Sequence, residues 1–593
     1  MKKTKAINKP KQLSTKKDQT PLFISLICVI SFIAFSPSLL NQIDIWDDYY
    51  YLNLNPYLKI LSFENIKNIF IHPYLANYQP FTLITYTFEY SLFKFNPLPY
   101  HLTNILLNLL NSVLLYFFIR QLTKSNNIAF VTAILFGIHP LHVESVTWVS
   151  ERKDVLYALF FILGMIFYLS FKEKKEKKYY YLTLAMFLFS CLSKAMAVTF
   201  SVILILLDYL KDKEFKFSSL YNKIPFFIIS LIFGLIAIKV QKEGGAIGFT
   251  SNNVYTFSDK FFFANYSLFF YIYKMFLPFH LSGLYPYPVK SGAPLPLPYL
   301  ISPFINAAFF FFIIYSIKRS KNIVFGCLFF LISIFPVLQI LSVGAAIAAD
   351  RYFYVASIGL FFLAGVGFNT IFENKKFVQY KSALIIFGIL IILGLSYQTS
   401  ERTKVWKNSG EFWGNVAEEF PKLELPYFNR GAYYYGIKNY DAALNDFSKA
   451  IECYPNYKEA LQWRAEIYTN QTKYNQAKED YLHLIRINTE NADVNTKLGE
   501  IFGRYLNNPD SAIIYLTKAN QLQPNNFSII DNIGISYAMK GKLELALQFF
   551  MQAQKLKPND QNTLMNISIT YKNMGNIKKA EEYHQYAVNA GRK

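Results

Sequence analysis

The stretch PLFISLICVISFIAFSPSLL, residues 21–40, contains no charged side chain. A run of roughly 18 or more apolar residues is long enough to cross a hydrocarbon core of about 30 Å. Similar runs follow one another as far as about residue 400. The first run is too long, and has too many successors, to be a cleaved signal peptide. The sequence therefore predicts a multi-pass membrane domain over residues 21–400.

The net charge of +21 over 593 residues is concentrated in the N-terminal tail and in short lysine-rich loops between these runs. Such loops stay on the cytoplasmic side of a membrane. Membrane topology thus explains the charge, and we expect no nucleic-acid partner. With the basic tail, residues 1–20, inside, we predict about eleven spans. They are 21–40, 101–120, 127–140, 154–171, 179–193, 196–210, 224–240, 299–317, 323–341, 353–372 and 382–399.

The segment 261–278 is also apolar enough to cross a membrane. A full crossing there would move the basic clusters at 318–321 and 375–381 to the outside, so we expect a re-entrant or interfacial helix. This topology places the C-terminal half outside. It places the loops 44–100 and 139–153 and the turns at Lys194 and Asp350 on the same face.

After about residue 420 the sequence repeats with a period of roughly 34 residues. The period is marked by Pro421, Pro455, Thr489, Pro524 and Pro558. Recurring small residues let paired helices approach, and proline ends the second helix of each pair. This pattern is typical of tetratricopeptide repeats. We therefore predict an all-α chain, in which a polytopic transmembrane helical domain is followed by a linker, residues 401–423, and an α-solenoid of about five repeats, residues 424–593.

Ionisable side chains gather at one predicted membrane edge. The segment HPLHVESVTWVSERKD, residues 139–154, holds histidines, acids, an arginine and a lysine between two apolar runs, and Asp47 and Asp48 follow the first run. Charged groups are costly at such depth and mark functional sites in membrane proteins. We interpret these residues as a charged reaction centre at one face of the membrane.

Several short motifs across the chain form a recognisable set. They are Asp47-Asp48, Tyr78-Gln79-Pro80-Phe81-Thr82, Tyr100-His101-Leu102-Thr103-Asn104, His139-Pro140-Leu141-His142-Val143-Glu144, Glu151-Arg152-Lys153-Asp154, Leu192-Ser193-Lys194 and Ala349-Asp350-Arg351-Tyr352. With the repeats that follow, the chain resembles the polytopic glycosyltransferases that use a polyprenyl-phosphate sugar donor. The resemblance is to the transmembrane and tetratricopeptide-repeat-containing O-mannosyltransferases, and most to their bacterial relatives, and it covers nearly the whole chain.

The resemblance implies that an acid in the first outer loop is the catalytic base, which maps onto Asp47 or Asp48. An acceptor hydroxyl that attacks a sugar carbon needs a carboxylate to orient it and take its proton. We favour Asp47, because it leads the pair. The alternative is that both acids only cap the next helix, a role for which aspartate is well suited.

Cations are expected where the phosphate of the donor develops its leaving charge. The nominated donor-phosphate residues are Arg152, Lys153, Lys194, Arg351, His139 and His142, and Glu144, Asp350, Tyr78 and Gln79 are nominated as supporting residues. The alternative for Arg152 and Lys153 is an interfacial anchor whose head reaches the headgroups.

A divalent metal is an alternative ligand of His139, His142 and Glu144, because imidazole and carboxylate bind several such metals. Two histidines at a helix end are more often hydrogen-bonded structure. No cofactor is therefore assigned, and a divalent metal stays open.

Lys194 is followed by Ala195, where the eukaryotic members of the resembling family carry an acid. This departure fits the bacterial relatives. A bacterial origin also agrees with the composition, which is rich in lysine, asparagine, isoleucine, phenylalanine and tyrosine. We therefore expect a multi-pass protein of a bacterial inner membrane.

The expected activity is transfer of a sugar, mannose or another hexose, from a polyprenyl-phosphate carrier to a protein or surface glycan on the extracytoplasmic side. The repeats either present a protein acceptor or only recruit protein partners. Two other classes of function stay open. One is a non-catalytic membrane scaffold, and the other is a glycan polymerase or transport factor.

Overall fold

The computed structural model describes residues 18–212, 217–247, 255–288, 294–340 and 344–591. The chain divides into two compact units, Met1–Glu419 and Phe420–Lys593. The basic tail predicted for residues 1–20 lies almost wholly outside the described residues. Each unit is built from helices, and each is described by itself.

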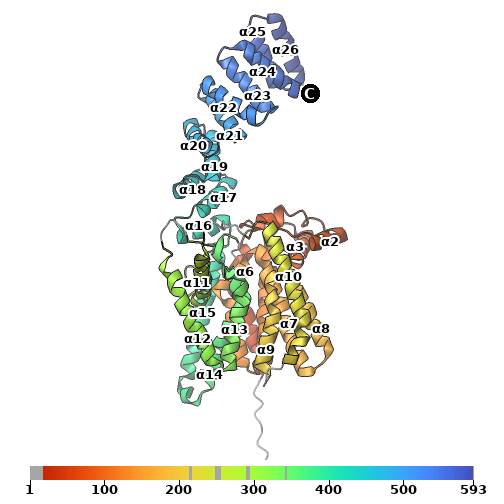
Figure 1. The fold of residues 1–593 in the computed structure, drawn as a ribbon, viewed down its shortest axis with the longest axis vertical. Coiled ribbons are helices and arrows are strands. Elements are labelled where there is room, and N and C mark those ends of the chain that lie inside the picture. Colours follow the sequence, from red (N-terminus) through yellow and green to blue (C-terminus); the bar gives the residue numbers. More distant parts are fainter. Residues whose placement is uncertain (1–17, 213–216, 248–254, 289–293, 341–343, 592–593) are drawn as a thin grey trace, which may run out of the picture. The chain divides into compact units, whose positions relative to one another are not determined.

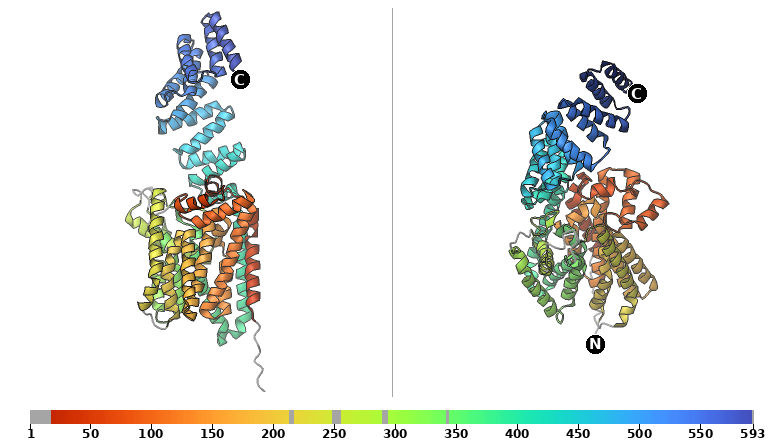
Figure 2. Two further views of the ribbon diagram at one scale, coloured as in Figure 1. Left: turned by 90° about the vertical axis from the view of Figure 1, so that its right-hand side faces the viewer. Right: turned by 45° about the horizontal axis from the view of Figure 1, so that its top comes forward.

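The first unit is a bundle of long helices that run side by side (Figures 1 and 2). They are α1 (Thr20–Phe35), α4 (Pro97–Thr123), α5 (Asn126–Ile138), α7 (Arg152–Lys174), α8 (Lys177–Ser193), α9 (Phe200–Lys211), α10 (Ile224–Glu243), α11 (Phe257–Phe276), α12 (Leu297–Ser316), α13 (Lys321–Ile334), α14 (Phe353–Glu373) and α15 (Lys381–Val405). The other helices of this unit are α2 (Phe63–Ile71), α3 (Pro80–Phe93), α6 (Val143–Thr147) and α16 (Ser409–Glu419).

Each of the eleven predicted spans falls on a helix of the bundle. Among the described residues, seven helices are long and apolar enough to cross a membrane, and the bent pair formed by α5 and residues 140–147 would make eight. The exact number of crossings therefore stays a prediction. The segment 261–278 lies on α11, which is not among those helices, and its re-entrant or interfacial placement also stays a prediction.

Local signals explain where the helices begin and end. Asn96 caps α4 by accepting a hydrogen bond from the backbone of Leu98, and Pro97 occupies the first turn, where a missing N–H costs nothing. The side chain of Ser125 caps α5 in the same way. Between α4 and α5, Lys124 adopts the left-handed conformation (φ 60°) and closes a tight turn.

One end of the bundle gathers the lysine-rich turns. Lys124 Nζ lies 3.0 Å from Glu173 Oε1, and Lys172 Nζ bridges Asp208 (3.0 Å) and Asp212 (2.7 Å). Lys321 Nζ donates to the carbonyl of Asp212 at 2.7 Å. The turn between α14 and α15 lies at this end, and α2 lies at the opposite end (Figures 1 and 2).

The first unit also contains a two-stranded antiparallel sheet. It pairs β1 (Tyr285–Pro286) with β2 (Ala346–Ala348), with Tyr285 opposite Ala348. The hydroxyl of Tyr271 on α11 donates to the carbonyl of Ala349 at 3.1 Å. The sheet and this bond fix the chain immediately before Arg351.

The second unit consists of five helix pairs in its described residues. They are α17 (Glu424–Gly436) with α18 (Tyr440–Cys453), α19 (Lys458–Asn470) with α20 (Tyr474–Ile487), α21 (Ala492–Glu500) with α22 (Pro509–Leu522), α23 (Phe527–Met539) with α24 (Leu543–Leu556), and α25 (Gln561–Asn573) with α26 (Ile577–Ala590). A Cβ added at Gly431 would lie 2.8 Å from the Phe447 ring, and one at Gly534 would lie 2.7 Å from the Phe550 ring. Small residues therefore let paired helices approach, as the sequence predicts.

Candidate active site at one end of the helix bundle

Glu151 is the centre of a group of charged side chains that we call the charged cluster. Its members are Glu144, Glu151, Lys153, Asp154, Lys194 and Arg351. The Glu151 carboxylate lies 2.9 Å from Lys153 Nζ, 3.4 Å from Arg351 Nε and 3.5 Å from Lys194 Nζ. One buried acid thus joins three cations that come from distant parts of the chain.

Lys194 enters the charged cluster from the turn between α8 and α9. It is the first residue after α8, where the chain is extended (φ −157°), and it forms an ion pair with Asp154. The other oxygen of Asp154 accepts a hydrogen bond from Ser145 Oγ at 3.1 Å. Asp154 lies in the first turn of α7, so its position follows from where that helix begins.

Arg351 reaches the charged cluster from the short 3-10 helix that follows β2, residues 350–352. Its backbone N–H donates to Glu144 Oε2 at 3.0 Å, and its guanidinium pairs with the other oxygen of the same carboxylate. The guanidinium lies 5.0 Å from the ring centroid of Tyr352 and 5.6 Å from that of Trp148. These contacts orient a planar cation of the kind that binds phosphate through two parallel hydrogen bonds.

The three cations keep part of their surface accessible. The exposed fraction of the side chain is 9% for Lys153, 12% for Lys194 and 19% for Arg351. Their acidic partners are more deeply buried, with 3% for Glu151 and none for Asp154. The charged cluster therefore presents positive charge outward and holds its negative charge inside.

Asp47 and Asp48 lie in the loop after α1, but their environments differ. Asp47 is half-buried; burial raises the pKa of its carboxyl, and Lys153 is the strongest influence that lowers it. Asp48 is fully buried, and its Oδ1 accepts a hydrogen bond from the backbone N–H of Ser150 at 2.9 Å. Burial raises the pKa of Asp48 to about 8. Only Asp47 therefore lies beside the cations with part of its surface accessible.

Gln79 borders the charged cluster through Tyr51, and Tyr78 lines a small pocket together with Lys194. Gln79 Nε2 donates to the Tyr51 hydroxyl at 2.8 Å, and Lys153 Nζ lies 5.5 Å from the centroid of the Tyr51 ring. The Tyr78 hydroxyl donates to the carbonyl of Phe70 at 3.0 Å. The small pocket is lined by residues 76–79, Lys194 and Ala195, and by Phe233, Ile236, Ala237 and Gln241 of α10.

Arg152 is not brought to the charged cluster, and its role as a phosphate ligand stays a prediction that its observed contacts do not support. Its side chain is fully buried and lies 2.5 Å from Glu89 Oε2. The same guanidinium donates to Asn104 Oδ1 at 2.8 Å and to the carbonyl of Tyr100 at 3.0 Å. Its hydrogen bonds hold α3 and α4 against the start of α7. Arg152 lies apart from Lys153 because consecutive residues point to different sides of a helix.

His139 and His142 are also held away from the three cations, in the core of the bundle. His139 Nε2 lies 3.0 Å from the carbonyl oxygen of Met275, and the ring nitrogens of His142 lie 2.8 Å from the carbonyl of Phe136 and 3.1 Å from Ser357 Oγ. Among the described residues, no three histidine, cysteine, aspartate or glutamate side chains are grouped so that they could hold a metal ion. The metal considered for His139, His142 and Glu144 therefore has no assembled site there.

Asp350 has a structural partner of its own. The hydroxyl of Tyr285 donates to Asp350 Oδ1 at 2.9 Å, and the carboxyl is buried. This bond links β1 to the turn that carries Arg351. Asp350 therefore supports the site through the backbone beside Arg351.

Glu151 and Asp154 are the site residues that were not nominated from the sequence, although both belong to a quoted motif. Their spacing of three places them on one face of a helix. That spacing was the available signal. The pairing of Glu144 with Arg351 spans 207 residues and has no local signal.

Comparison with known proteins supports the resemblance. Residues 72–240 match the family model described as dolichyl-phosphate-mannose-protein mannosyltransferase. Residues 425–457, 447–479 and 528–560 match tetratricopeptide-repeat models. The expected resemblance to the transmembrane and tetratricopeptide-repeat-containing O-mannosyltransferases and the predicted repeats are therefore confirmed, whereas the closer likeness to bacterial relatives stays a prediction. The chain is a multi-pass membrane protein with a helical repeat unit.

Curated relatives include a protein O-mannosyl-transferase of Caenorhabditis elegans, 23% identical over 65% of this chain and 54% of its own length. Protein O-mannosyl-transferase TMTC1 of Homo sapiens is 23% identical over 65% of this chain and 49% of its own length. The chain thus spans about half the length of the curated relatives it matches. A solved structure that aligns with part of the chain is YrrB, a tetratricopeptide-repeat protein, with 25% identity, a TM-score of 0.29, and coverage of 30% of this chain and 93% of that one.

Proposed function

We propose that this protein is a membrane glycosyltransferase that moves mannose or another hexose from a polyprenyl-phosphate carrier to a protein or surface-glycan acceptor. The observation that carries the proposal is the position of Asp47 beside two partly accessible cations, Lys153 and Arg351, which share the Glu151 carboxylate with Lys194. Of these cations, Lys153 and Lys194 lie within the region that matches the mannosyltransferase family model.

The site supplies the two kinds of charge that the reaction requires, a carboxylate for the acceptor hydroxyl and cations for the donor phosphate. Asp47 orients the acceptor hydroxyl and takes its proton as the oxygen attacks the anomeric carbon. The bond between that carbon and the phosphate oxygen breaks, and the phosphate leaves with the bonding electrons. Lys194 and Arg351 stabilise the charge that develops on the phosphate, in a site whose acids are already paired.

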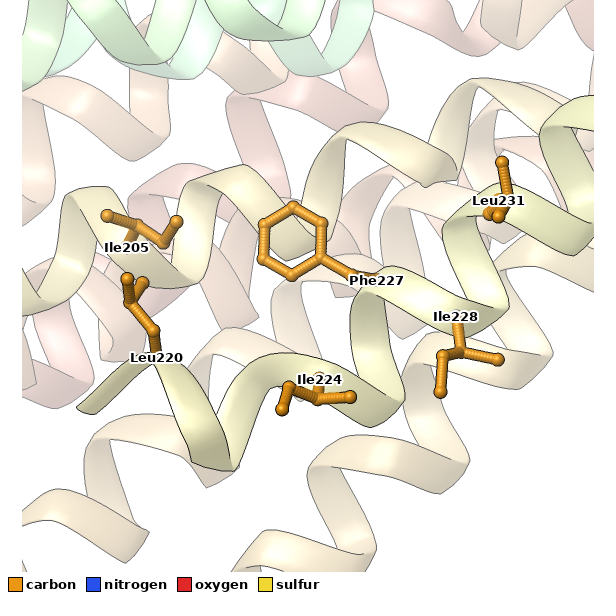
Figure 3. A pocket seen from close by; sticks show the side chains of 6 residues that line it. All are labelled: Ile205, Leu220, Ile224, Phe227, Ile228 and Leu231. Carbon is orange, nitrogen blue, oxygen red and sulfur yellow. The ribbon is translucent and has the colours of Figure 1, made fainter. Parts of the chain in front are cut away.

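An apolar groove offers a path for the lipid chain of the donor. It has a volume of about 490 Å³ and is lined by Ile205 of α9, Leu220, and Ile224, Phe227, Ile228 and Leu231 of α10, as Figure 3 shows. Further along α10, Phe233 and Ile236 line the small pocket that contains Lys194. The proposal is that the polyprenyl chain lies along α10 and its phosphate meets Lys194.

The acceptor is proposed to arrive from the extracytoplasmic side of a bacterial inner membrane. The support is that the lysine-rich turns adjoin one another at one end of the bundle, while the charged cluster draws on the loops predicted for the other face. The tetratricopeptide repeats are proposed to hold a protein acceptor, because tethering raises its local concentration near the site.

Cells with and without the gene provide the test of this function. Loss of the gene should remove hexose-bearing glycoproteins or surface glycans and lead to accumulation of the lipid-linked sugar. Wild-type protein and Glu373→Gln, an exposed acid at the lysine-rich end, should restore them, whereas Lys194→Met should not. Equal restoration by Lys194→Met, or unchanged glycans without the gene, would favour the scaffold instead.

A further inference from the structure

The residue before Asp47 has an unusual backbone. Trp46 adopts the left-handed conformation, with φ 46°. Bulky side chains rarely take this conformation, and it persists only where the surroundings determine it. The direction of the Asp47 side chain therefore depends on whatever holds Trp46.

Rings from two other parts of the chain hold Trp46. Its centroid lies 5.9 Å from that of Trp148, 5.1 Å from that of Trp413 and 6.2 Å from that of Phe412. Trp148 also fixes the backbone one residue earlier, because its indole N–H donates to the carbonyl of Ile45 at 3.2 Å. Trp413 and Phe412 both belong to α16, the last helix of the first unit.

Helix α16 is itself firmly seated. The ring of Phe412 packs on the backbone of Gly283, where an added Cβ would lie 2.0 Å from it. Trp406 is 1% exposed and packs between Phe412 (4.7 Å) and Trp148 (5.4 Å). These contacts pack α16 against the backbone of Gly283 and, through Trp406, against Trp148.

Polar bonds join the same elements. The backbone N–H of Gln42 donates to the carbonyl of Lys407 at 2.8 Å, and Asn41 Nδ2 donates to the carbonyl of Thr403 at 3.0 Å. The loop after α1 is thus bound at its start by the end of α15 and at Trp46 by α16. None of these groups belongs to the charged cluster.

We propose that Phe412 and Trp413 are positioning residues, which hold Trp46 in its left-handed conformation and thereby keep Asp47 beside the cations of the charged cluster. They act through Trp46 and do not touch the reacting atoms. The catalytic consequence rests on the proposed function, whereas the effect on the loop does not.

The first test measures transfer by full-length protein in lipid nanodiscs, with polyprenyl-phosphate mannose as the donor probe. Trp413→Ala should lower kcat by roughly 10- to 100-fold, since a small displacement of a catalytic group has that effect, and should leave the KM for the donor nearly unchanged. Trp413→Phe keeps a ring at this position and should retain most of the rate. A raised KM with an unchanged kcat would overturn the proposal.

A double-mutant cycle separates this mechanism from a general loss of stability. Glycine accepts a positive φ without strain, so Trp46→Gly removes the need for the aromatic support. In that background Trp413→Ala should change kcat by less than about twofold, because the two residues act through one contact. An undiminished effect of Trp413→Ala would mean that α16 acts by another route.

Hydrogen exchange of residues 41–53 gives a readout that needs no activity. Trp413→Ala should speed exchange there, and the matched change Trp463→Ala in the repeats should not. If wild-type protein transfers no sugar, the proposed function is refuted. Faster exchange in Trp413→Ala would still support the positioning role. Unchanged exchange would refute the positioning role itself.

Discussion

At the scale of single residues, neighbouring side chains in this protein have unrelated roles. Asp47 lies beside Lys153, while Asp48 is buried and bound to the backbone of Ser150. Similarly, Lys153 joins the charged cluster while Arg152 pairs with Glu89. The sequence shows that charge is concentrated here, but not which member of each pair faces the site, because that depends on helix phase and on partners from distant segments.

Asp48 provides a prediction on pH and stability. Its pKa is about 8 in the folded protein and near the ordinary 3.8 when unfolded, so between these values only the folded state holds the proton. Stability from this group is therefore lost as pH rises through that window, by up to about 1.4 kcal/mol per pH unit. Asp48→Asn keeps an acceptor for Ser150 and carries no charge. It should raise the thermal unfolding temperature at pH 8 and leave it unchanged at pH 4; an identical pH dependence in both proteins would count against this reading.

Arg152 provides a prediction that separates structure from substrate binding. Glu89→Gln removes the carboxylate that pairs with this buried guanidinium, and breaking such a pair costs about 3–5 kcal/mol. The variant should unfold at a clearly lower temperature in detergent, with the donor KM of the remaining folded protein unchanged. Glu373→Gln serves as the exposed control. Normal stability with a raised donor KM would instead indicate that Arg152 binds the donor phosphate.

At the scale of elements, helices in the bundle approach most closely where glycines face each other. A Cβ at Gly359 of α14 would lie 2.3 Å from the carbonyl oxygen of Gly326 on α13, whereas a Cβ at Gly388 of α15 would meet nothing within 4 Å. Gly359→Ala should therefore destabilise the protein by about 1–3 kcal/mol through overpacking. Gly388→Ala should be neutral or slightly stabilising. Equal unfolding temperatures for the two variants would contradict the observed packing of α13 on α14.

The elements themselves follow closely from sequence pattern. Long apolar runs and a period near 34 residues are strong signals, and a helix lies at every predicted span and repeat. The count of crossings is less determined, because α8 and α9 are short and α5 is bent against the residues that follow it. The left-handed backbone of Trp46 has no sequence signal, since it results from rings supplied by residues 148, 412 and 413.

At the scale of the whole molecule, we expect the charged cluster and the repeats to lie on the same side of the membrane. In a protein without native cysteines, a membrane-impermeant thiol reagent applied to intact cells should label Glu64→Cys in α2 and Lys572→Cys in the repeats. Lys376→Cys, in the turn after α14, should be labelled only after permeabilisation. Labelling of Lys572→Cys only after permeabilisation would separate the repeats from the proposed site.

The central claim is that Asp47 is the base of a sugar transfer from a lipid-linked donor. Purified protein in nanodiscs, supplied with polyprenyl-phosphate mannose and an acceptor protein from cells that lack the gene, tests it most directly. We expect Asp47→Asn to fold as the wild type does and to lose at least about 100-fold in kcat, as follows from loss of a general base. Transfer by Asp47→Asn at the wild-type rate would contradict it.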